Sequence, residues 1–420
     1  MIERGTEDPA NADLESSRVP YRREPIVSGG FEFGAQVAAS LESLPRYIGL
    51  GGTSELWAGK WRRLDPIDFG RLRDGRGWPL AYVDLVPYYD RVAADYGWPV
   101  WFEDASFGQY GQLAAAYGLK LVEIYEEDPP LRLRSRWNEL RDHLSVEILC
   151  RAQLIDAAFD SHERCIRRIR VTDGTGARWI DAPQFVVACG GIESVHVSHQ
   201  LRALSRAESA MPSSAPLPAK YPGFVDHPKG FVGELRPGRH ASFIDYLHRG
   251  QTRLKRLLGF SLPEEELASQ GLGNHTVFLW QNETAAGPLR MVINLEQFPE
   301  EQNYVSVCAK PSVSWHVSHR TWTDCQTFLD LISARLEAFI GPVTIDETMR
   351  FRGASHHCGA IPMGLPGQSV VNKDCRFHDV ANLYCASSAV FPIAGSANPT
   401  MTIVALSNRL SSHLQTRDGR

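Results

Sequence analysis

Residues 185–201 read FVVACGGIESVHVSHQL, an apolar run that enters two glycines and continues into a segment compatible with a helix. A strand, a glycine turn and a helix in this order are typical of a nucleotide-binding α/β fold. Glycine lets the backbone approach a ligand closely, and the N-terminus of the helix attracts a phosphate or another anion. Many such turns bind nothing, so a purely structural turn is an equal alternative for this stretch.

Strand and helix signals lie on both sides of this stretch. Short apolar strands are expected from residue 144 onwards, with a hairpin turn at the Asp-Gly of TDGTGA, residues 172–177. More strands are expected between residues 231 and 317. Residues 109–125 have a mixed, helix-like character, and apolar residues at helical spacing predict a helix over residues 321–340.

The composition indicates a globular protein of more than one domain. The chain has 420 residues, of which 43% are hydrophobic and 22% are charged. Single domains usually run to about 100–200 residues, so two or more domains are expected. The formal net charge is −5, and the short basic clusters are interrupted by apolar residues. We therefore expect no nucleic-acid partner.

The eight cysteines show neither a C-x-x-C motif nor the spacing of zinc ligands. No metal site is expected, and several of these cysteines lie in apolar runs, where they are interpreted as small buried hydrophobes. No stretch of about 18 apolar residues predicts a membrane span, and no signal peptide is recognised. A reduced, cytoplasmic location fits this pattern.

The C-terminal part of the chain carries three segments that bear on chemistry: SHHCGAIPMG at 355–364, NLYCASSAVFP at 382–392 and GSANPTMTIVALSNRLSSHL at 395–414. The second predicts a buried strand and a turn. In the third, Asn398 suits the N-cap of a helix and Pro399 suits its first position. The N-terminus of this helix would stabilise negative charge on a ligand. Apolar residues that would face the core follow at helical spacing, at 403, 406, 410 and 414.

His356 is the natural candidate for a general base. An unperturbed histidine has a pKa of about 6.5, so it can accept a proton at neutral pH. A histidine in an apolar segment is more often structural than catalytic. The Asn-Pro helix start downstream favours the catalytic interpretation for His356.

These segments together resemble the glucose–methanol–choline (GMC) oxidoreductases, a family that holds FAD and oxidises alcohols. HHCGAIPMG at 356–364 is similar to the family pattern H-x-x-G-T-x-R-M-G, and ANPT at 397–400 is similar to its closing N-P-T helix start. GGTS at 51–54, with Trp57, resembles the G-G-x-S segment beside the flavin. Residues 185–194 resemble its V-V-x-A-x-G-x-x-x-S turn.

A further block points to particular branches of the family. WPLAYVDLVPYY at 78–89 resembles the W-P-x-x-Y-x-D-L-x-P-Y-Y block of the sugar- and polyol-oxidising branches. The matches occur in the expected order and span nearly the whole chain. The resemblance therefore implies an oxidoreductase that acts on a CH–OH group.

The resemblance also implies roles for matching residues. His356 would take the hydroxyl proton of the substrate, Asn398 would hydrogen-bond the same hydroxyl, and the hydrogen on carbon would pass as a hydride to the flavin N5. His357 is the rival base, which alternation along an extended segment would point to the opposite side. The residues implied in cofactor binding are Glu3, Gly51, Gly52, Thr53, Ser54, Trp57, Ala188, Gly190, Pro399 and Thr400.

The implied ligands are FAD and a small alcohol. FAD is expected to be held without a covalent bond, because Leu56 stands where some sugar-oxidising relatives carry a histidine that bonds the cofactor. The Trp- and Tyr-rich part of 61–144 suits stacking against a sugar, polyol or cyclitol. Oxygen and other electron acceptors are both compatible with the sequence.

The implied fold is α/β, with a Rossmann-like FAD-binding domain and an antiparallel-sheet substrate domain. The FAD-binding domain would be discontinuous, formed by residues 1–60, 145–225 and 350–420. Residues 61–144 would cover the flavin and shape the entrance, and residues 226–349 would form the substrate domain. The sequence Asp-His-Pro at 226–228 resembles the family's entry to that domain and is interpreted as a structural turn.

The N-terminus departs most from the family pattern. The family opens with a strand, a G-x-G-x-x-G loop, a helix and a second strand whose acidic end holds the ribose. Residues 2–5 resemble the end of that second strand, with Glu3 in the acidic position, and the first strand and glycine loop are missing. We expect the natural protein to start about 30 residues earlier, the length of the missing portion. The alternative is a true truncation that binds flavin poorly or not at all.

Three other classes of function fit the sequence less well. A flavin-free pseudoenzyme or binding protein of the same fold would fit the missing glycine loop, but the retained His356 and Asn398 argue against it. An NAD(P)-dependent dehydrogenase also needs the glycine loop and leaves the C-terminal segments unexplained. Hydrolysis by a serine nucleophile is not expected, because the chain has no G-x-S-x-G motif.

Overall fold

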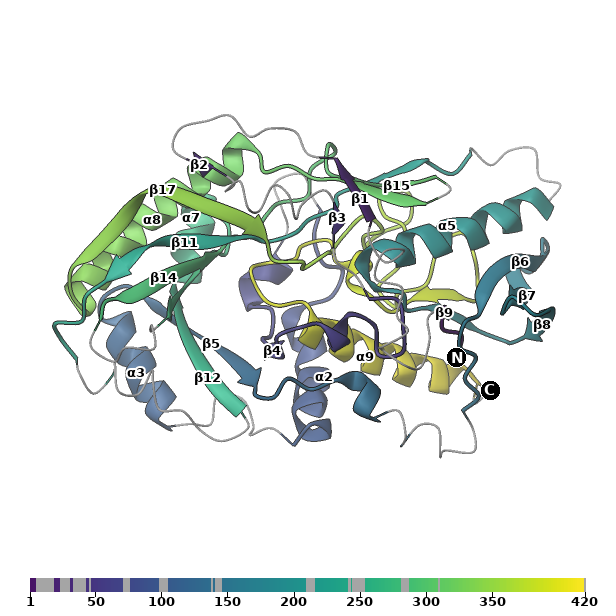
Figure 1. The fold of residues 1–420 in the computed structure, drawn as a ribbon, viewed down its shortest axis with the longest axis horizontal. Helices are drawn as coiled ribbons and strands as arrows, with labels where there is room; N and C mark the ends of the chain where they lie inside the picture. The colour runs from purple at the N-terminus through teal and green to yellow at the C-terminus, as the bar shows by residue number, and fades with distance from the viewer. Residues whose placement is uncertain are drawn as a thin grey trace.

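A computed structural model of the chain describes residues 1–4, 19–22, 31–32, 43–44, 47–70, 76–97, 105–136, 139, 146–208, 216–240, 243, 254–280, 287–308 and 310–418. The molecule is elongated (Figure 1). A large sheet and its helices form one end, and two long helices on either side of a short parallel strand pair form the other.

The large sheet has eight described strands in the order β2-β17-β11-β14-β13-β12-β5-β4. All neighbouring strands run antiparallel except β2 and β17. This result agrees with the expected antiparallel substrate-side sheet. The strands span Phe31–Glu32 (β2), Lys60–Trp61 (β4), Lys120–Glu127 (β5), Pro228–Leu235 (β11), Leu254–Ser261 (β12), Thr276–Trp280 (β13), Leu289–Asn294 (β14) and Val343–Gly353 (β17).

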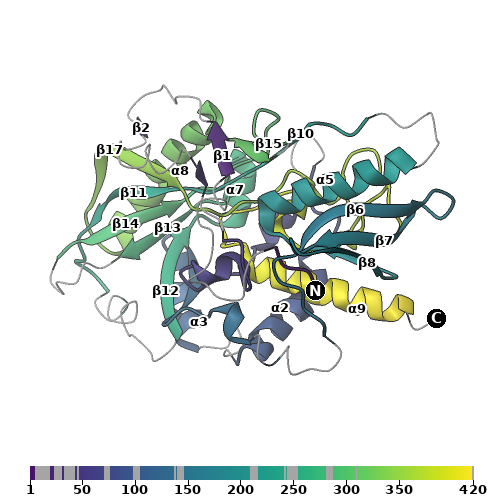
Figure 2. The same ribbon diagram turned by 45° about the vertical axis from the view of Figure 1, so that its right-hand side comes forward.

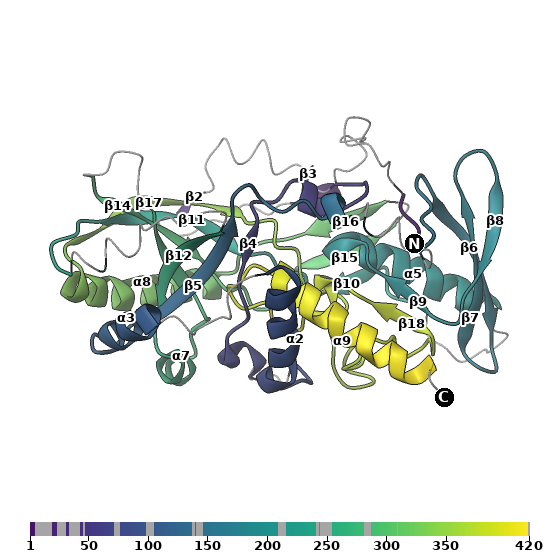
Figure 3. The ribbon, with the colours of Figure 1, turned by 90° about the horizontal axis from the view of Figure 1, so that it is seen from below.

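Helix α8, His319–Phe339, covers one face of this sheet (Figure 3). Its apolar residues at helical spacing are buried in the main core, and Trp322 packs against Phe351 of β17 with ring centroids 4.8 Å apart. The helix predicted over 321–340 is therefore confirmed. Alternation along the strands sends Val122, Ile124 and Phe278 to the opposite face, where they form a separate apolar cluster.

The other end of the molecule contains the predicted strand–glycine–helix unit. Strand β9, Phe185–Val187, leads into helix α5, Gly190–Glu208, and pairs in parallel with β18, Leu383–Cys385. Helix α9, Thr400–Asp418, lies on the opposite side of β9 from α5 (Figure 1). Parallel strands with helices on both sides are the arrangement of a nucleotide-binding α/β fold.

Two further sheets flank these parts. Strands β6, β7 and β8 form an antiparallel sheet beside α5 (Figure 2), and TDGTGA forms the predicted hairpin turn between β7 and β8. The second sheet has the order β10-β15-β16-β1-β3. The bounds are Gln153–Asp160 (β6), Cys165–Thr172 (β7), Ala177–Asp181 (β8), Lys220–Pro222 (β10), Tyr304–Val307 (β15), Pro311–Ser314 (β16), Val19–Arg22 (β1) and Ser43–Leu44 (β3).

The remaining helices are short, apart from α2, which packs beside α9. The hydroxyl of Tyr89 on α2 lies 2.8 Å from that of Thr402 on α9, and both residues are buried. No described helix is long and apolar enough to span a membrane. The bounds are Tyr82–Asp95 (α2), Ala105–Ala115 (α3), Glu264–Gln270 (α7), Gly52–Glu55 (η2), Pro66–Phe69 (η3), Leu133–Arg136 (η4) and Ser388–Val390 (η5).

The helix-like interpretation of residues 109–125 is wrong for its second half. Helix α3 ends at Ala115, and Gly118 adopts a φ of +70°, a left-handed conformation that commonly stops a helix. The chain then continues as β5, which pairs along its whole length with β12. Sheet pairing thus overrides the local helical spacing of apolar residues.

Candidate active site

His356 lies in a segment that is bonded to the turn before α9. Strand β17 ends at Gly353, and the following chain passes beside η5. The amides of Gly359, Ile361 and Met363 donate to the carbonyls of Ser388, Ala389 and Val390 at 3.0, 3.1 and 2.8 Å, respectively. The two segments singled out in the sequence therefore form one structural unit.

The buried carboxylate of Asp226 holds the start of this segment in place. Its Oδ1 accepts from the backbone amides of His227 at 2.7 Å and His356 at 2.8 Å, and its Oδ2 accepts from the amide of Ser355 at 3.1 Å. Ser355 has a φ of +61°, an uncommon conformation for a residue other than glycine. The hydrogen bonds to Asp226 support this turn, which sets the position of His356.

His356 contacts two polar side chains from distant parts of the sequence. Its Nε2 lies 3.0 Å from Nδ2 of Asn398, and its Nδ1 lies 2.9 Å from Nδ1 of His227. The two imidazole rings meet edge to face, with centroids 4.9 Å apart. The structure therefore brings together the predicted pair His356 and Asn398 and adds His227 to it.

His357 points elsewhere, as alternation predicted. Its ring lies against Phe224 with centroids 5.8 Å apart, and its carbonyl accepts from the hydroxyl of Ser388 at 2.6 Å. The same carbonyl lies close to α5, since a Cβ on Gly191 would come within 2.2 Å of it. The first turn of α5 therefore adjoins the segment that carries His356.

Both contacting histidines are held in the neutral form. Burial lowers the pKa of His356 well below the usual range, and the nearby His227, Lys229, His357 and Lys60 lower it further. Burial, with a smaller contribution from the cations Arg62 and Lys229, lowers the pKa of His227 to about 3. A neutral imidazole has a free lone pair, which a general base requires.

Two buried atoms beside His356 have no hydrogen-bond partner among the described residues. They are Nε2 of His227 and Oδ1 of Asn398. Buried polar groups are nearly always hydrogen-bonded, so each such atom calls for an explanation. A polar ligand group between these side chains would supply the missing partner.

A buried polar network supports the loop that carries Asn398. Arg62 donates to the hydroxyls of Ser396 at 3.2 Å and Thr276 at 3.1 Å, and to a carboxylate oxygen of Asp65 at 2.6 Å. Thr276 and Ser396 also contact each other at 3.0 Å. Ser396 lies two residues before Asn398, so its hydrogen bond with Arg62 holds the loop of Asn398 in place.

Asn274 links three acidic side chains next to this network. The amide of Asn274 donates to carboxylate oxygens of Asp65 and Asp68, each at 2.9 Å, and the backbone amide of Asn274 donates to Glu296 at 2.6 Å. Burial and the nearby charge of Asp65 raise the pKa of Asp68 to about 7, while burial and Asp68 raise that of Glu296 to about 8. At neutral pH much of this acidic charge is therefore neutralised by protons.

Helix α9 starts slightly later than predicted. Its first residue is Thr400, and the carbonyl of Pro399 accepts the helical bond from the amide of Ile403 at 2.9 Å. Asn398 was expected to cap this helix, but its amide is turned toward His356. Leu406 and Leu410 of the predicted apolar stripe are buried, and Ile403 and Leu414 are partly buried against the core.

The predicted cofactor residues at 51–57 form a tight turn. Gly51 and Gly52 adopt φ values of +92° and +58°, and a Cβ on Gly52 would meet no atom within 4 Å. Thr53 is exposed, and the hydroxyl of Ser54 donates to the carbonyl of Gly51 at 2.7 Å. The indole N–H of Trp57 donates to the carbonyl of Leu131 at 2.7 Å, so this side chain fixes the turn to η4's segment.

Ala188, Gly190 and Glu3 gather near the start of α5. Gly190 adopts a φ of +77°, and a Cβ there would meet no atom within 4 Å. The amide of Glu3 donates to the carbonyl of Leu149 at 2.8 Å, and Arg4 pairs with Glu193 in the first turn of α5 at 3.1 Å. The first four residues of the chain thus lie beside the N-terminus of α5, as the implied fold requires.

The sequence matches known proteins over most of its length. Residues 315–407 match the family described as GMC oxidoreductase. The fructose dehydrogenase large subunit of Gluconobacter japonicus is 36% identical over 442 residues, which cover 86% of this chain and 79% of that protein. This chain belongs to the GMC oxidoreductase family.

Other relatives of this GMC oxidoreductase are more distant. The 2-methyl-1,2-propanediol dehydrogenase of Mycolicibacterium austroafricanum is 23% identical over 88% of this chain and 81% of that protein. Pyridoxine 4-oxidase from Mesorbium loti has the same fold, with a TM-score of 0.61 and 14% identity over 99% of this chain and 94% of that one. Formate oxidase also has this fold, with a TM-score of 0.61 and 13% identity, and the match covers 99% of this chain and 93% of that one.

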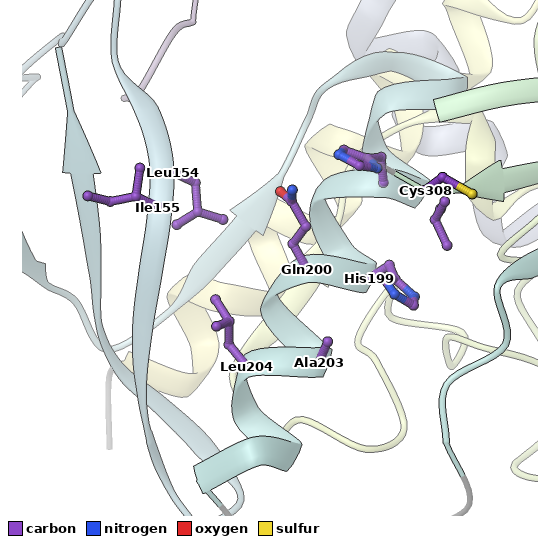
Figure 4. Close-up of a pocket in the computed structure, with 9 residues that line it drawn as sticks. Leu154, Ile155, His199, Gln200, Ala203, Leu204 and Cys308 are labelled. Atoms are coloured by element: carbon purple, nitrogen blue, oxygen red, sulfur yellow. The ribbon is translucent and has the colours of Figure 1, made fainter. Parts of the chain in front are cut away.

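A groove of about 360 Å³ lies away from this constellation. It runs along the middle of α5 and is lined by Leu154 and Ile155 of β6, His199 and Leu204 of α5, and Cys308 (Figure 4). None of the residues that line it belongs to the segments around His356. We therefore do not assign the chemistry of this GMC oxidoreductase to the groove.

Sequence reasoning missed two contributors to the site. His227 was interpreted as part of a structural turn, yet its ring contacts His356. Arg62 carried no signal, because its partner Ser396 lies 334 positions away in sequence. A buried histidine within a family motif was the available hint for His227, whereas no spacing pattern could have indicated Arg62.

All eight cysteines are free.

Proposed function

We propose that this GMC oxidoreductase oxidises the CH–OH group of a sugar, polyol or cyclitol with FAD as its cofactor and His356 as its base. When bound, the flavin supplies a two-electron acceptor that takes the hydrogen of the alcohol carbon as a hydride. The observation that carries the proposal is the contact between the neutral His356 and Asn398, next to an unpartnered Asn398 oxygen.

The described residues fit a non-covalently bound flavin near His356. The turn at Gly51 and Gly52 leaves open space for close approach, and so does Gly190 at the start of α5. The N-termini of α5 and α9 carry partial positive charge, which favours the pyrophosphate and the electron-rich ring of a flavin. We assign the predicted cofactor residues Glu3, Gly51, Gly52, Thr53, Ser54, Trp57, Ala188, Gly190, Pro399 and Thr400 to this role.

His356 and Asn398 would divide the handling of the substrate hydroxyl. Nε2 of His356 would accept the hydroxyl proton, and the side chain of Asn398 would hold the hydroxyl oxygen in position. Removing this proton makes the carbon a better hydride donor, and a fixed geometry raises the rate of the transfer. Asp226 and His227 position His356 for this step through the contacts described above.

The domain division of the sequence is part of the same proposal. Residues 1–60, 145–225 and 350–420 would hold FAD, residues 61–144 would cover it, and residues 226–349 would bind substrate. Contacts across the first set support this: Arg202 pairs with Asp379 at 2.9 Å, and the side-chain amide of Asn382 donates to the carbonyl of Ile166 at 2.8 Å. The names of the relatives, a sugar dehydrogenase subunit and a diol dehydrogenase, support the substrate class.

The test is anaerobic mixing of the FAD-loaded protein with a panel of sugars, polyols and cyclitols, followed by the visible absorption of the flavin. We expect bleaching with at least one alcohol. His356→Ala should retain bound flavin and lose bleaching by about 10²–10⁴-fold in rate, the usual contribution of a general base. His413→Ala, a change of a partly buried histidine on α9, is the control.

Two outcomes would count against the proposal. A wild-type protein that binds FAD but is bleached by no alcohol would point to a pseudoenzyme of this fold. Normal bleaching in His356→Ala would remove His356 as the base, and loss of bleaching in His357→Ala alone would move that role to the neighbouring histidine.

A further inference from the structure

The strand that follows His227 carries an unusual lysine. His227 and Lys229 are two residues apart along extended chain, so their side chains lie on the same face of the large sheet. The register continues without a break, because the amide of Ala354 donates to the carbonyl of His227 and Lys229 of β11 pairs with Arg352 of β17. On its other side Lys229 pairs with Asn294 of β14.

Lys229 is half-buried, and no carboxylate among the described residues forms an ion pair with it. Two other nearby cations are paired. Lys60 lies 3.7 Å from Glu126, and Arg290, farther along the same sheet face, lies within 3.3 Å of Glu234 and Asp346. Neither Lys229 nor Arg352, its exposed partner on β17, forms an ion pair with a described carboxylate, so this part of the sheet carries two cations without a directly paired anion.

Burial and neighbouring cations together lower the pKa of Lys229. Burial, together with the charges of Lys60 and Arg352, lowers its pKa to about 8. The lysine is still mostly protonated at neutral pH. Lys229 in turn lowers the pKa of both His227 and His356. A partly desolvated cation of this kind is stabilised by an anion that enters the site.

Polar atoms without partners extend from His356 toward Lys229. Oδ1 of Asn294, opposite Lys229 in the sheet, is buried and has no hydrogen-bond partner among the described residues. The same holds for Nε2 of His227 and Oδ1 of Asn398. The sheet face therefore offers acceptors and a donor for several hydroxyl groups, between a base at one end and a cation at the other.

We propose that the substrate is a polyhydroxy acid, whose carboxylate binds Lys229 while one of its hydroxyls lies between His356 and Asn398. The intervening hydroxyls would contact His227 and Asn294. This inference rests on the proposed function, since it names the class of alcohol that the same site oxidises.

Matched pairs of acid and alcohol test the proposal on the FAD-loaded protein. Gluconate and glucitol differ at one terminal carbon, as do xylonate and xylitol, and glycerate and glycerol. For each compound, the second-order rate constant of flavin bleaching is measured without oxygen, and direct binding is measured by titration calorimetry. We expect the acid of a pair to exceed its alcohol by at least about tenfold, the scale of one charge-assisted hydrogen bond.

Substitution of the lysine assigns that preference. Lys229→Met should lower the ratio of the acid to the alcohol, in both rate constant and affinity, by at least about tenfold. Lys229→Arg should retain most of the preference, because it keeps the charge. Lys310→Met, at an exposed lysine just before β16, is the matched control and should behave as wild type.

The outcomes separate this inference from the proposed function. Alcohols that bleach the flavin as fast as their acids, or an acid preference that survives Lys229→Met, would overturn the inference and leave the oxidoreductase function intact. Bleaching by none of the compounds would count against the proposed function. In that case the calorimetry decides the inference: gluconate must bind more tightly than glucitol, and only while Lys229 is present.

Discussion

Nδ1 of His227 lies 2.9 Å from Nδ1 of His356, so one of these nitrogens donates a hydrogen bond and the other accepts it. Nδ2 of Asn398 donates to Nε2 of His356 at 3.0 Å, which makes Nε2 an acceptor. A neutral imidazole carries a single N–H, and in His356 it is therefore on Nδ1 and points to His227. Asn398 and His227 together thus select the tautomer in which the lone pair of His356 is on Nε2, on the side of Asn398.

Replacing His227 should impair the chemical step more than substrate binding. His227→Phe keeps a ring but removes the acceptor for the Nδ1–H of His356, and we expect the limiting rate of flavin bleaching to fall on the order of 100-fold. The Michaelis constant should change much less. His227→Asn, which offers an oxygen acceptor, should recover part of the rate. Equal rates in wild type and His227→Phe would show that the tautomer does not depend on this contact.

Loss of the Asn398 amide should slow the reaction without abolishing it. Asn398→Ala removes one hydrogen bond to the substrate hydroxyl, an interaction of about 1 kcal/mol, and should reduce the rate of flavin bleaching by about fivefold. The base His356 is still present in this variant. Stopped-flow measurement on the flavin-loaded protein is the check. A rate within a factor of two of wild type would place the hydroxyl away from Asn398.

The buried polar network around Arg62, which supports the loop of Asn398, should contribute to the free energy of unfolding. Arg62 is 3% exposed, and Arg62→Met would leave Asp65 with Lys120 as its remaining cation. We expect a loss of about 3 kcal/mol in the free energy of unfolding, measured by urea denaturation. Arg178→Met removes the exposed pair with Glu147 and should cost less than about 1 kcal/mol. Similar losses in both variants would contradict a structural role of the network.

Stability should depend on pH through Glu296. In the unfolded chain this carboxyl loses its proton near its ordinary pKa of 4.5, whereas the folded protein keeps it until about pH 8. The folded state therefore binds more protons between these values, and its stability falls as pH rises through this window. Glu296→Gln cannot ionise and keeps an oxygen for the Asn274 amide, so its melting temperature should fall less steeply from pH 5 to 8. Parallel curves for the two proteins would show that the pKa of Glu296 is not raised.

Local patterns in the sequence predicted much of the fold. The strand–glycine–helix unit at 185–201, the hairpin at 172–177 and the helix over 321–340 all depend on residues that are close in sequence, and all three are present. The strand at Lys120–Glu127 was not predicted, because its apolar residues are fixed by pairing with β12, a segment more than a hundred positions away. Local spacing contains no information about such a partner.

In the candidate site, too, some residues could be predicted from local sequence and others could not. His356 and Asn398 could be predicted from the sequence to act together, because each lies in its own recognisable segment. In the structure Nε2 of His356 lies 3.0 Å from Nδ2 of Asn398. Lys229 and Asn294 lie in ordinary strand sequence, and only the sheet register sets them side by side. Local spacing assigned Asn398 to the helix cap, but its Oδ1 accepts no hydrogen bond from the described helix and its Nδ2 contacts His356 instead.

The hydrogen bonds between residues 359–363 and 388–390 join the segment of His356 to the turn before Asn398. Lys229 and Asn294, in contrast, belong to separate strands of the large sheet. If the sheet face binds the substrate as proposed, we expect substitutions at Lys229 and Asn294 to change which alcohol is accepted while the hydrogen bonds between 359–363 and 388–390 stay in place. For enzyme engineering, this makes the sheet face the region to randomise and the His356–Asn398 unit the region to keep, so that new substrate ranges can be selected on an unchanged chemical step.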